Sequence, residues 1–297
     1  MASNKMHKGE VEINAQLVRQ LLLTQFPHLS DLPVTAARST GTVNAIYRLG
    51  DELCVRLPRV QTWAHDLVKE LEWLPRLAPH LPLTIPEPVA KGEGGSGYPF
   101  PWAVYRWIEG ETFAADRVAD EQQAAADLAS FVTELQRVDP SGAPRSGRRP
   151  LLQLDDITRA AIESLRGIAD TEVAITAWET SLRATEWDGR SVWIHCDLLP
   201  PNLLVEDGRL KAVIDFGATG AGDPAQDMTP AWSVFGSIGR RIFRTALDVD
   251  EVTWIRGRGY ALHQAALIIP YYSETNPEFV AMAIRTVEQI INDERSS

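Results

Sequence analysis

Apolar residues recur with a helical period near the start of the chain. In the segment 14–26, Leu17, Leu21 and Leu22 fall on one face behind Asn14. This spacing predicts an amphipathic helix, and Asn14 is a suitable N-cap because its side chain can accept a hydrogen bond from the first turn. Pro27 should end the helix.

The pattern then changes to that of short strands. Three β-prone runs cover residues 34–38, 44–49 and 52–57, and the turn pair Gly50 and Asp51 separates the last two. A Gly-Asp turn between two such runs predicts a β-hairpin. A loop of small residues, 39–43, lies between the first two runs.

A helical period returns at residues 62–78, where we expect Pro75 to kink or break the helix. A Gly-rich hairpin tip at 92–97 and a strand that ends at Gly110 follow. The first part of the chain is therefore predicted to be a small sheet crossed by one helix.

The remainder is mainly helical. A β-hairpin turning at Asp207 and Gly208 interrupts it, with strands predicted over 191–195 and 202–217. The other periodic segments predict helices near 121–138, 155–169, 172–187, 226–246, 250–271 and 277–293. The fold class expected from this order is α+β.

Composition narrows the function classes. The 297 residues carry a formal net charge of −11, which disfavours nucleic acid as a partner. No apolar run is long enough to span a membrane, and the polar N-terminus has no signal-peptide core. Cys54 and Cys196 are too few and too distant for a disulfide framework or a metal site. We therefore expect a cytoplasmic protein with no membrane partner.

Candidate chemistry is concentrated in residues 192–217. His195 and Asp197 are followed by Asn202, and Asp215 begins an Asp-Phe-Gly triplet after the hairpin. Phosphoryl transfer needs a group that orients an attacking hydroxyl and oxygen ligands for Mg²⁺. This ordered set supplies one acceptor for the hydroxyl proton and two metal ligands, and it matches the pattern of protein kinases. No Walker-type phosphate loop occurs in the sequence.

The same stretch resembles the aminoglycoside phosphotransferase family of small-molecule kinases. The common family loop reads HGDLHPGN and this chain has HCDLLPPN, while GAGDPAQDM at 220–228 matches a further family signature. The resemblance implies a protein-kinase-like bilobal fold. Its small N-terminal antiparallel-sheet lobe with one main helix would cover residues 1–108, and a larger, mostly helical C-terminal lobe would cover 109–297.

The resemblance also implies roles for individual residues. Asp197 would accept or orient the proton of the substrate hydroxyl. Asn202 and Asp215 would ligate Mg²⁺. His195 would support the loop from beneath, and Asp227 would brace it, although a helix cap is an equally good interpretation of Asp227.

In the small lobe, the resemblance suggests that Arg56 faces the phosphates of ATP or GTP, where related folds have Lys. Glu70 is the expected anchor for Arg56, although both could be surface charges. The hinge beside the purine would use backbone groups near Arg106, Trp107 and Ile108. The loop over the phosphates would comprise Ser39, Thr40, Gly41 and Thr42.

The acceptor is less determined. The acidic balance suits a cationic aminoglycoside-like antibiotic, but solubility explains it as well. The acceptor could also be a macrolide, choline, homoserine or an amino sugar. The protein could instead be a nucleotide-binding pseudokinase, an alternative that the departures from the family pattern at Arg56, Cys196 and Pro201 support. Retention of all three oxygen-bearing residues favours an active enzyme, which we expect to be a monomer or weak dimer.

Overall fold

The computed structural model describes residues 10–37 and 43–296, and the chain divides into two compact units. The first unit comprises residues 1–79, 84–110 and 212–217, and the second comprises 80–83, 111–211 and 218–297. No helix in the described ranges is long and apolar enough to cross a membrane.

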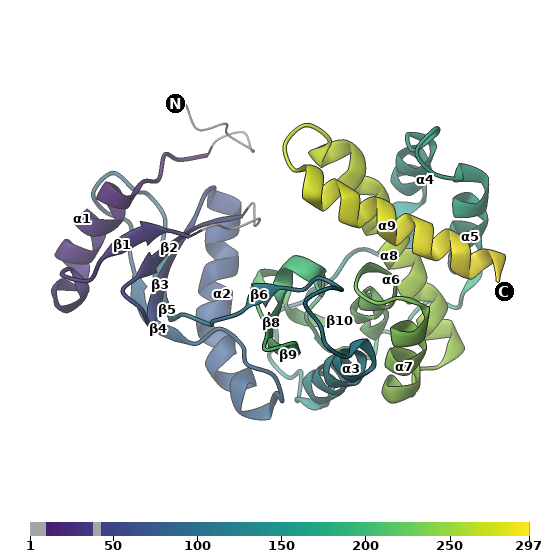
Figure 1. Ribbon diagram of the computed structural model, residues 1–297, viewed down its shortest axis with the longest axis horizontal. Coiled ribbons are helices and arrows are strands. Elements are labelled where there is room, and N and C mark those ends of the chain that lie inside the picture. The colour runs from purple at the N-terminus through teal and green to yellow at the C-terminus, as the bar shows by residue number, and fades with distance from the viewer. Residues whose placement is uncertain (1–9, 38–42, 297) are drawn as a thin grey trace. The chain divides into compact units, whose positions relative to one another are not determined.

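The first unit is built on an antiparallel five-stranded sheet (Figure 1). Its strand order is β1-β2-β3-β5-β4, and the hairpin turn between β2 and β3 places Gly50 at φ +60°. The strands are β1 (Val34–Ala36), β2 (Asn44–Leu49), β3 (Leu53–Pro58), β4 (Pro88–Gly92) and β5 (Trp102–Arg106).

Two helices accompany this sheet. Helix α1 (Ala15–Gln25) begins at the predicted cap, where Asn14 accepts a hydrogen bond from the N–H of Leu17 at 2.9 Å. Helix α2 (Gln61–Leu77) packs beside β3, β4 and β5. Of the predicted kink or break at Pro75, the break is wrong: the helix continues through Pro75 to Leu77, and the N–H of Ala78 still donates to the carbonyl of Leu74.

The second unit is mainly helical, as expected. Helix α8 lies at its centre and contacts α4, α5 and α9 (Figure 1). The helices are α3 (Glu121–Arg137), α4 (Asp155–Glu163), α5 (Thr171–Arg183), α6 (Pro230–Ser233), α7 (Ser237–Leu247), α8 (Glu251–Tyr272) and α9 (Pro277–Arg295).

The predicted helix over 226–246 is interrupted. Residues Pro224–Met228 form a 3₁₀ helix, η6, and α6 and α7 follow as separate helices. Pro230 starts α6, and the N–H of Gly236 before α7 donates to the Glu121 carboxylate instead of continuing a helix. An apolar pattern can therefore stay unbroken through a bend whose backbone groups find partners elsewhere in the fold.

Short strands support the loops that carry the candidate chemistry. Strands β6 (Glu111–Thr112), β8 (Leu203–Glu206) and β9 (Arg209–Val213) form one sheet, with left-handed Asp207 and Gly208 at the β8–β9 turn. Strand β7 (Val192–Ile194) pairs antiparallel with β10 (Gly220–Gly222), a strand that the sequence did not predict. The β7–β10 pairing fixes the start of the loop that contains His195 and Asp197.

Candidate functional site

The loop between β7 and β8 holds Asp197 by both carboxylate oxygens. The side-chain amide of Asn202 donates to Oδ2 at 2.8 Å and to the Asp197 carbonyl at 2.9 Å. From α8, the amide of Gln264 donates to Oδ1 at 2.9 Å. Both donors are neutral amides, and together they fix the direction of the carboxylate.

Asn202 keeps an oxygen for a further partner. Its amide nitrogen makes both bonds to Asp197, which leaves the carbonyl oxygen Oδ1 outside these contacts. An amide oxygen is a donor type that Mg²⁺ accepts. The 3₁₀ turn η4 (Pro200–Asn202) positions this side chain, and prolines suit its first positions because no turn hydrogen bond is required from their nitrogens. Pro201 is therefore compatible with the loop.

Asp227 fastens the other end of the loop. Its carboxylate is fully buried and accepts hydrogen bonds from the backbone N–H groups of His195 at 2.8 Å and Cys196 at 2.7 Å. Burial raises the pKa of Asp227 to about 6, against the lowering effect of the two N–H donors. The cap of η6 is made instead by Asp223, which accepts from the N–H of Ala225.

Cys196 occupies a backbone conformation that favours glycine. Its φ is +69°, in the left-handed region, which gives a physical reason for the glycine at this position in the common family loop. Its thiol donates to Oε1 of Gln226 at 3.3 Å, and burial raises its pKa to about 11, so it stays a thiol. Beneath it, His195 is fully buried and its Nδ1 accepts from the N–H of Asp197 at 3.3 Å.

The first unit contains a separate network of charges. Arg56 lies on β3 with its Nη1 at 2.9 Å from Oε2 of Glu70 on α2, and its Nη2 is 3.4 Å from Oδ1 of Asp215. The hydroxyl of Tyr105 also donates to Glu70, at 3.2 Å. Burial opposes the charge of Arg56, but the carboxylates outweigh it and the pKa of Arg56 rises. The pair is thus an internal ion pair and not a set of surface charges.

Asp215 is the accessible member of this network. Its side chain is 30% exposed, whereas those of Arg56 and Glu70 are 10% and 1% exposed. Its φ of +65° shows that the chain turns sharply at this residue. A partly exposed carboxylate with a cation at one oxygen can still offer its other oxygen to a metal ion.

The predicted hinge residues have different backbone partners. The N–H of Arg106 donates to the carbonyl of Glu87 at 2.9 Å, and the N–H of Trp107 donates to that of Glu52 at 2.7 Å. Within the described ranges, the N–H of Ile108 has no backbone acceptor.

The structure brings together some of the predicted residues and leaves others undescribed. Arg56, Glu70 and Asp215 meet in the first unit; Asp197, Asn202, His195 and Asp227 meet in the second. Ser39, Thr40, Gly41 and Thr42 lie outside the described residues. Across the described residues, no three His, Cys, Asp or Glu side chains cluster as a metal site, so a metal would depend on the mixed amide and carboxylate set proposed from the sequence.

Two contributing residues were missed by the sequence analysis. Gln264 stands in a largely apolar stretch of α8, and that isolated amide was an available signal. Tyr105 gave no signal, because an aromatic residue in a strand is ordinary core.

Comparison with known proteins decides the family. The sequence profile of the phosphotransferase enzyme family matches residues 35–261. The chain belongs to the phosphotransferase enzyme family. Its fold agrees with that assignment: the structure of the GDP complex of aminoglycoside 2'-phosphotransferase-IIIa superposes with a TM-score of 0.71 at 20% identity, covering 95% of this chain and 99% of the other.

The same fold also occurs in a phosphotransferase named for a different class of antibiotic, the macrolides. Macrolide 2'-phosphotransferase MphH from Brachybacterium faecium matches with a TM-score of 0.59 at 22% identity, over 93% of this chain and 97% of that one. A curated relative, the uncharacterized protein YcbJ of Bacillus subtilis, is 26% identical over 163 residues, which is 53% of this chain and 51% of YcbJ. The match thus spans about half of that relative.

The predicted kinase-like fold is confirmed by the similarity to the aminoglycoside phosphotransferase structure.

Proposed function

We propose that this protein transfers the γ-phosphate of ATP or GTP to a hydroxyl group of a small molecule. Membership of the phosphotransferase enzyme family supports the reaction class. The observation that carries the proposal is the state of Asp197, a carboxylate held at both oxygens by neutral amides. Such a carboxylate is held in one direction, as a group that accepts a hydroxyl proton must be.

Asp197 would orient the acceptor hydroxyl and take its proton as the phosphoryl group is transferred. The amides of Asn202 and Gln264 keep the carboxylate from rotating away, and Asp227 keeps the backbone of the loop in place. A fixed carboxylate lowers the entropic cost of reaching the reactive geometry.

The nucleotide would be held by residues of the first unit. Nη2 of Arg56 is 3.4 Å from Asp215, a long contact, so this nitrogen can turn to a phosphate oxygen while Nη1 keeps its shorter bond to Glu70. The backbone N–H of Ile108 would donate a hydrogen bond to the base. Oδ1 of Asn202 and the carboxylate of Asp215 would hold Mg²⁺, which when bound neutralises charge on the phosphates.

An aminoglycoside-like antibiotic is the first acceptor to test. Aminoglycoside phosphotransferases of the same fold form complexes with kanamycin and gentamicin, and the net charge of −11 suits a polycation. Two acidic residues of the helical unit are already engaged, Asp223 with Arg256 and Glu251 with Arg244, so they are not free for a cation. A macrolide is the second acceptor class, because macrolide phosphotransferases share the fold.

The test is an acceptor screen by mass spectrometry with ATP or GTP and Mg²⁺. Kanamycin, gentamicin, a macrolide, choline, homoserine and an amino sugar would each be examined for the mass of one added phosphate. We expect one class to be modified and Asp197→Asn to lower kcat by about 10²–10⁴-fold. Asp215→Ala should also remove activity.

Glu72→Ala, an exposed change on α2, is the matched control and should keep full activity. Full activity in Asp197→Asn would contradict the assignment. Nucleotide binding without transfer to any acceptor would favour the pseudokinase alternative.

A further inference from the structure

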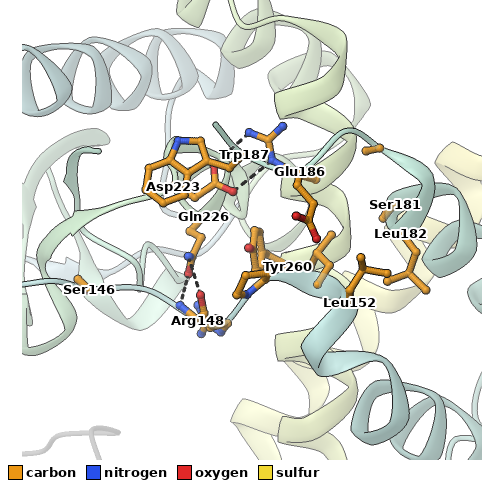
Figure 2. A pocket seen from close by; sticks show the side chains of 14 residues that line it. Ser146, Arg148, Leu152, Ser181, Leu182, Glu186, Trp187, Asp223, Gln226 and Tyr260 are labelled. Carbon is orange, nitrogen blue, oxygen red and sulfur yellow. Dashed lines mark hydrogen bonds and ion pairs between the residues drawn. The ribbon is translucent and has the colours of Figure 1, made fainter. Parts of the chain in front are cut away.

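The second unit contains a pocket of about 120 Å³, which Figure 2 shows from close by. Its walls come from the segment before α4, the end of α5, η6 and α8. Leu151, Leu152 and Leu182 supply an apolar side, and Trp187 supplies an aromatic one. All lining residues belong to the second unit, so the pocket is complete within it.

Most polar groups of this pocket are already satisfied. Asp223 and Arg256 form a buried two-point ion pair, with both N–O distances at 3.1 Å. The amide of Gln226 is bonded through both its oxygen and its nitrogen to the backbone of residue 148. These groups hold the walls together and have little capacity left for a ligand.

Tyr260 is the first exception. Tyr260 lines the pocket and is only 3% exposed. Its hydroxyl makes no hydrogen bond with the other described residues. Burial raises the pKa of Tyr260, so the hydroxyl stays protonated and able to donate. The hydroxyl oxygen is not among the buried polar atoms that lack a partner, so it is open to the pocket, where a ligand or water can pair with it.

Arg148 and Glu186 are the other exceptions. The guanidinium of Arg148 donates through Nη1 to the Cys196 carbonyl at 3.2 Å, but it pairs with no carboxylate in the described parts of the chain. Glu186, an exposed residue at the rim, pairs with no cation there. In Figure 2 these two side chains lie on different sides of Tyr260. Within the described residues, the pocket thus presents a guanidinium and a carboxylate that form no ion pair, on different sides of Tyr260.

We propose that this pocket binds a small zwitterion whose carboxylate meets Arg148 and the Tyr260 hydroxyl and whose ammonium lies toward Glu186. A guanidinium and a phenol are a natural donor pair for a carboxylate, and a short apolar linker would pack on the leucines. Because Arg148 also bonds the Cys196 carbonyl, next to Asp197, the ligand would act on the candidate catalytic loop from behind. The site does not depend on the proposed phosphotransfer.

Three matched probes test the site: 4-aminobutanoate, butanoate and butylamine. Binding would be followed by the NMR signal of the Trp187 indole N–H, assigned with Trp187→Phe, in the absence of nucleotide. We expect 4-aminobutanoate to bind most tightly, butanoate several-fold more weakly, and butylamine not to saturate. No saturable shift with any probe, or tighter binding of butylamine than of butanoate, would overturn the proposal.

Variants locate the binding. Arg148→Gln should weaken the binding of 4-aminobutanoate at least tenfold. Tyr260→Phe should weaken it about fivefold, which corresponds to the loss of one hydrogen bond. Tyr260→Phe removes an unpartnered hydroxyl and should fold normally, which a thermal melt checks. Glu186→Gln should abolish the preference for 4-aminobutanoate over butanoate.

The neighbouring exposed Arg149 supplies a matched control. Arg149→Gln should leave binding unchanged, and an equal loss in Arg148→Gln and Arg149→Gln would show only general charge attraction and reject the site. Asp197→Asn should bind the probe like the wild type, so failure of the phosphotransfer proposal and failure of this one are separately visible.

Discussion

The two units hold their candidate functional carboxylates in opposite ways. In the first unit, Asp215 and Glu70 share the charge of Arg56, which is buried. In the second, Asp197 is held by two neutral amides, and buried Asp227 accepts only backbone N–H groups. One arrangement balances charge with charge, whereas the other fixes direction with dipoles.

This difference has a consequence for what each unit tolerates. A buried ion pair that loses one partner leaves a charge without compensation, so its disruption should affect folding first. A carboxylate that loses a neutral donor keeps its charge and its access to water, so the effect should fall on geometry and rate. Stability should therefore be the sensitive readout for the ion pair of the first unit, and catalysis for the amide donors to Asp197 in the second.

The largest expected effect is from breaking the ion pair. Glu70→Ala strands the buried Arg56 guanidinium and should lower the free energy of unfolding by about 3–5 kcal/mol. Urea unfolding measures it. Glu72→Ala, on the exposed side of the same helix, should change stability by no more than about 0.5 kcal/mol. Equal losses in both variants would show that the pair is not a special feature of this unit.

The next largest effect is a pH dependence of stability, which should arise from a neutral histidine ring buried in the second unit. His263 is 5% exposed, lies 2.8 Å from the Thr158 hydroxyl, and burial lowers its pKa to about 4. The unfolded chain binds this proton near pH 6.5, so stability should fall as pH drops from 6.5 to 4, by about 3 kcal/mol from this group.

Unfolding free energies of wild type and His263→Gln across this pH range measure the contribution. The variant should show a flatter pH dependence, whereas His28→Gln, at an exposed position, should keep the wild-type slope. A slope unchanged in His263→Gln would mean that the ring is not held neutral by the fold.

A smaller effect should follow from the neutral donor on α8. Gln264→Ala removes the hydrogen bond to Oδ1 of Asp197 and should lower kcat about tenfold, with unfolding little changed. Gln264→Glu places a second carboxylate beside Asp197, so it should raise the pKa of Asp197 and move the acidic limb of the pH–rate profile upward. Gln153→Ala, at an exposed site, is the control. A pH profile unaltered in Gln264→Glu would argue against this positioning role.

The smallest effect concerns the backbone at Cys196. A left-handed residue other than glycine costs about 1–2 kcal/mol, and both Cys196→Gly and Cys196→Ala lose the thiol contact with Gln226. Cys196→Gly should therefore be more stable than Cys196→Ala by about 1 kcal/mol, measured by thermal or urea unfolding. The reverse order would show that φ at this residue relaxes in the variants.

The sequence by itself determined the family, the candidate chemistry and most of the order of elements. A phosphotransferase could be predicted from the spacing of Asp197, Asn202 and Asp215, because a loop that binds phosphate and metal needs fixed residue types at fixed separations. The Asn14 cap and the turn at Gly50 were also predictable, since each depends on atoms a few residues apart.

Only the tertiary structure decided which polar groups meet across long stretches of chain. Gln264 reaches Asp197 over 67 residues, and Arg148 reaches Cys196 over 48. The hidden β10 strand and the break between α6 and α7 are of the same kind, because their backbone partners lie in distant segments. The local periodicity of apolar residues indicates which face of a helix or strand is buried. The partner of a buried polar atom, by contrast, depends on how distant segments of the chain pack together.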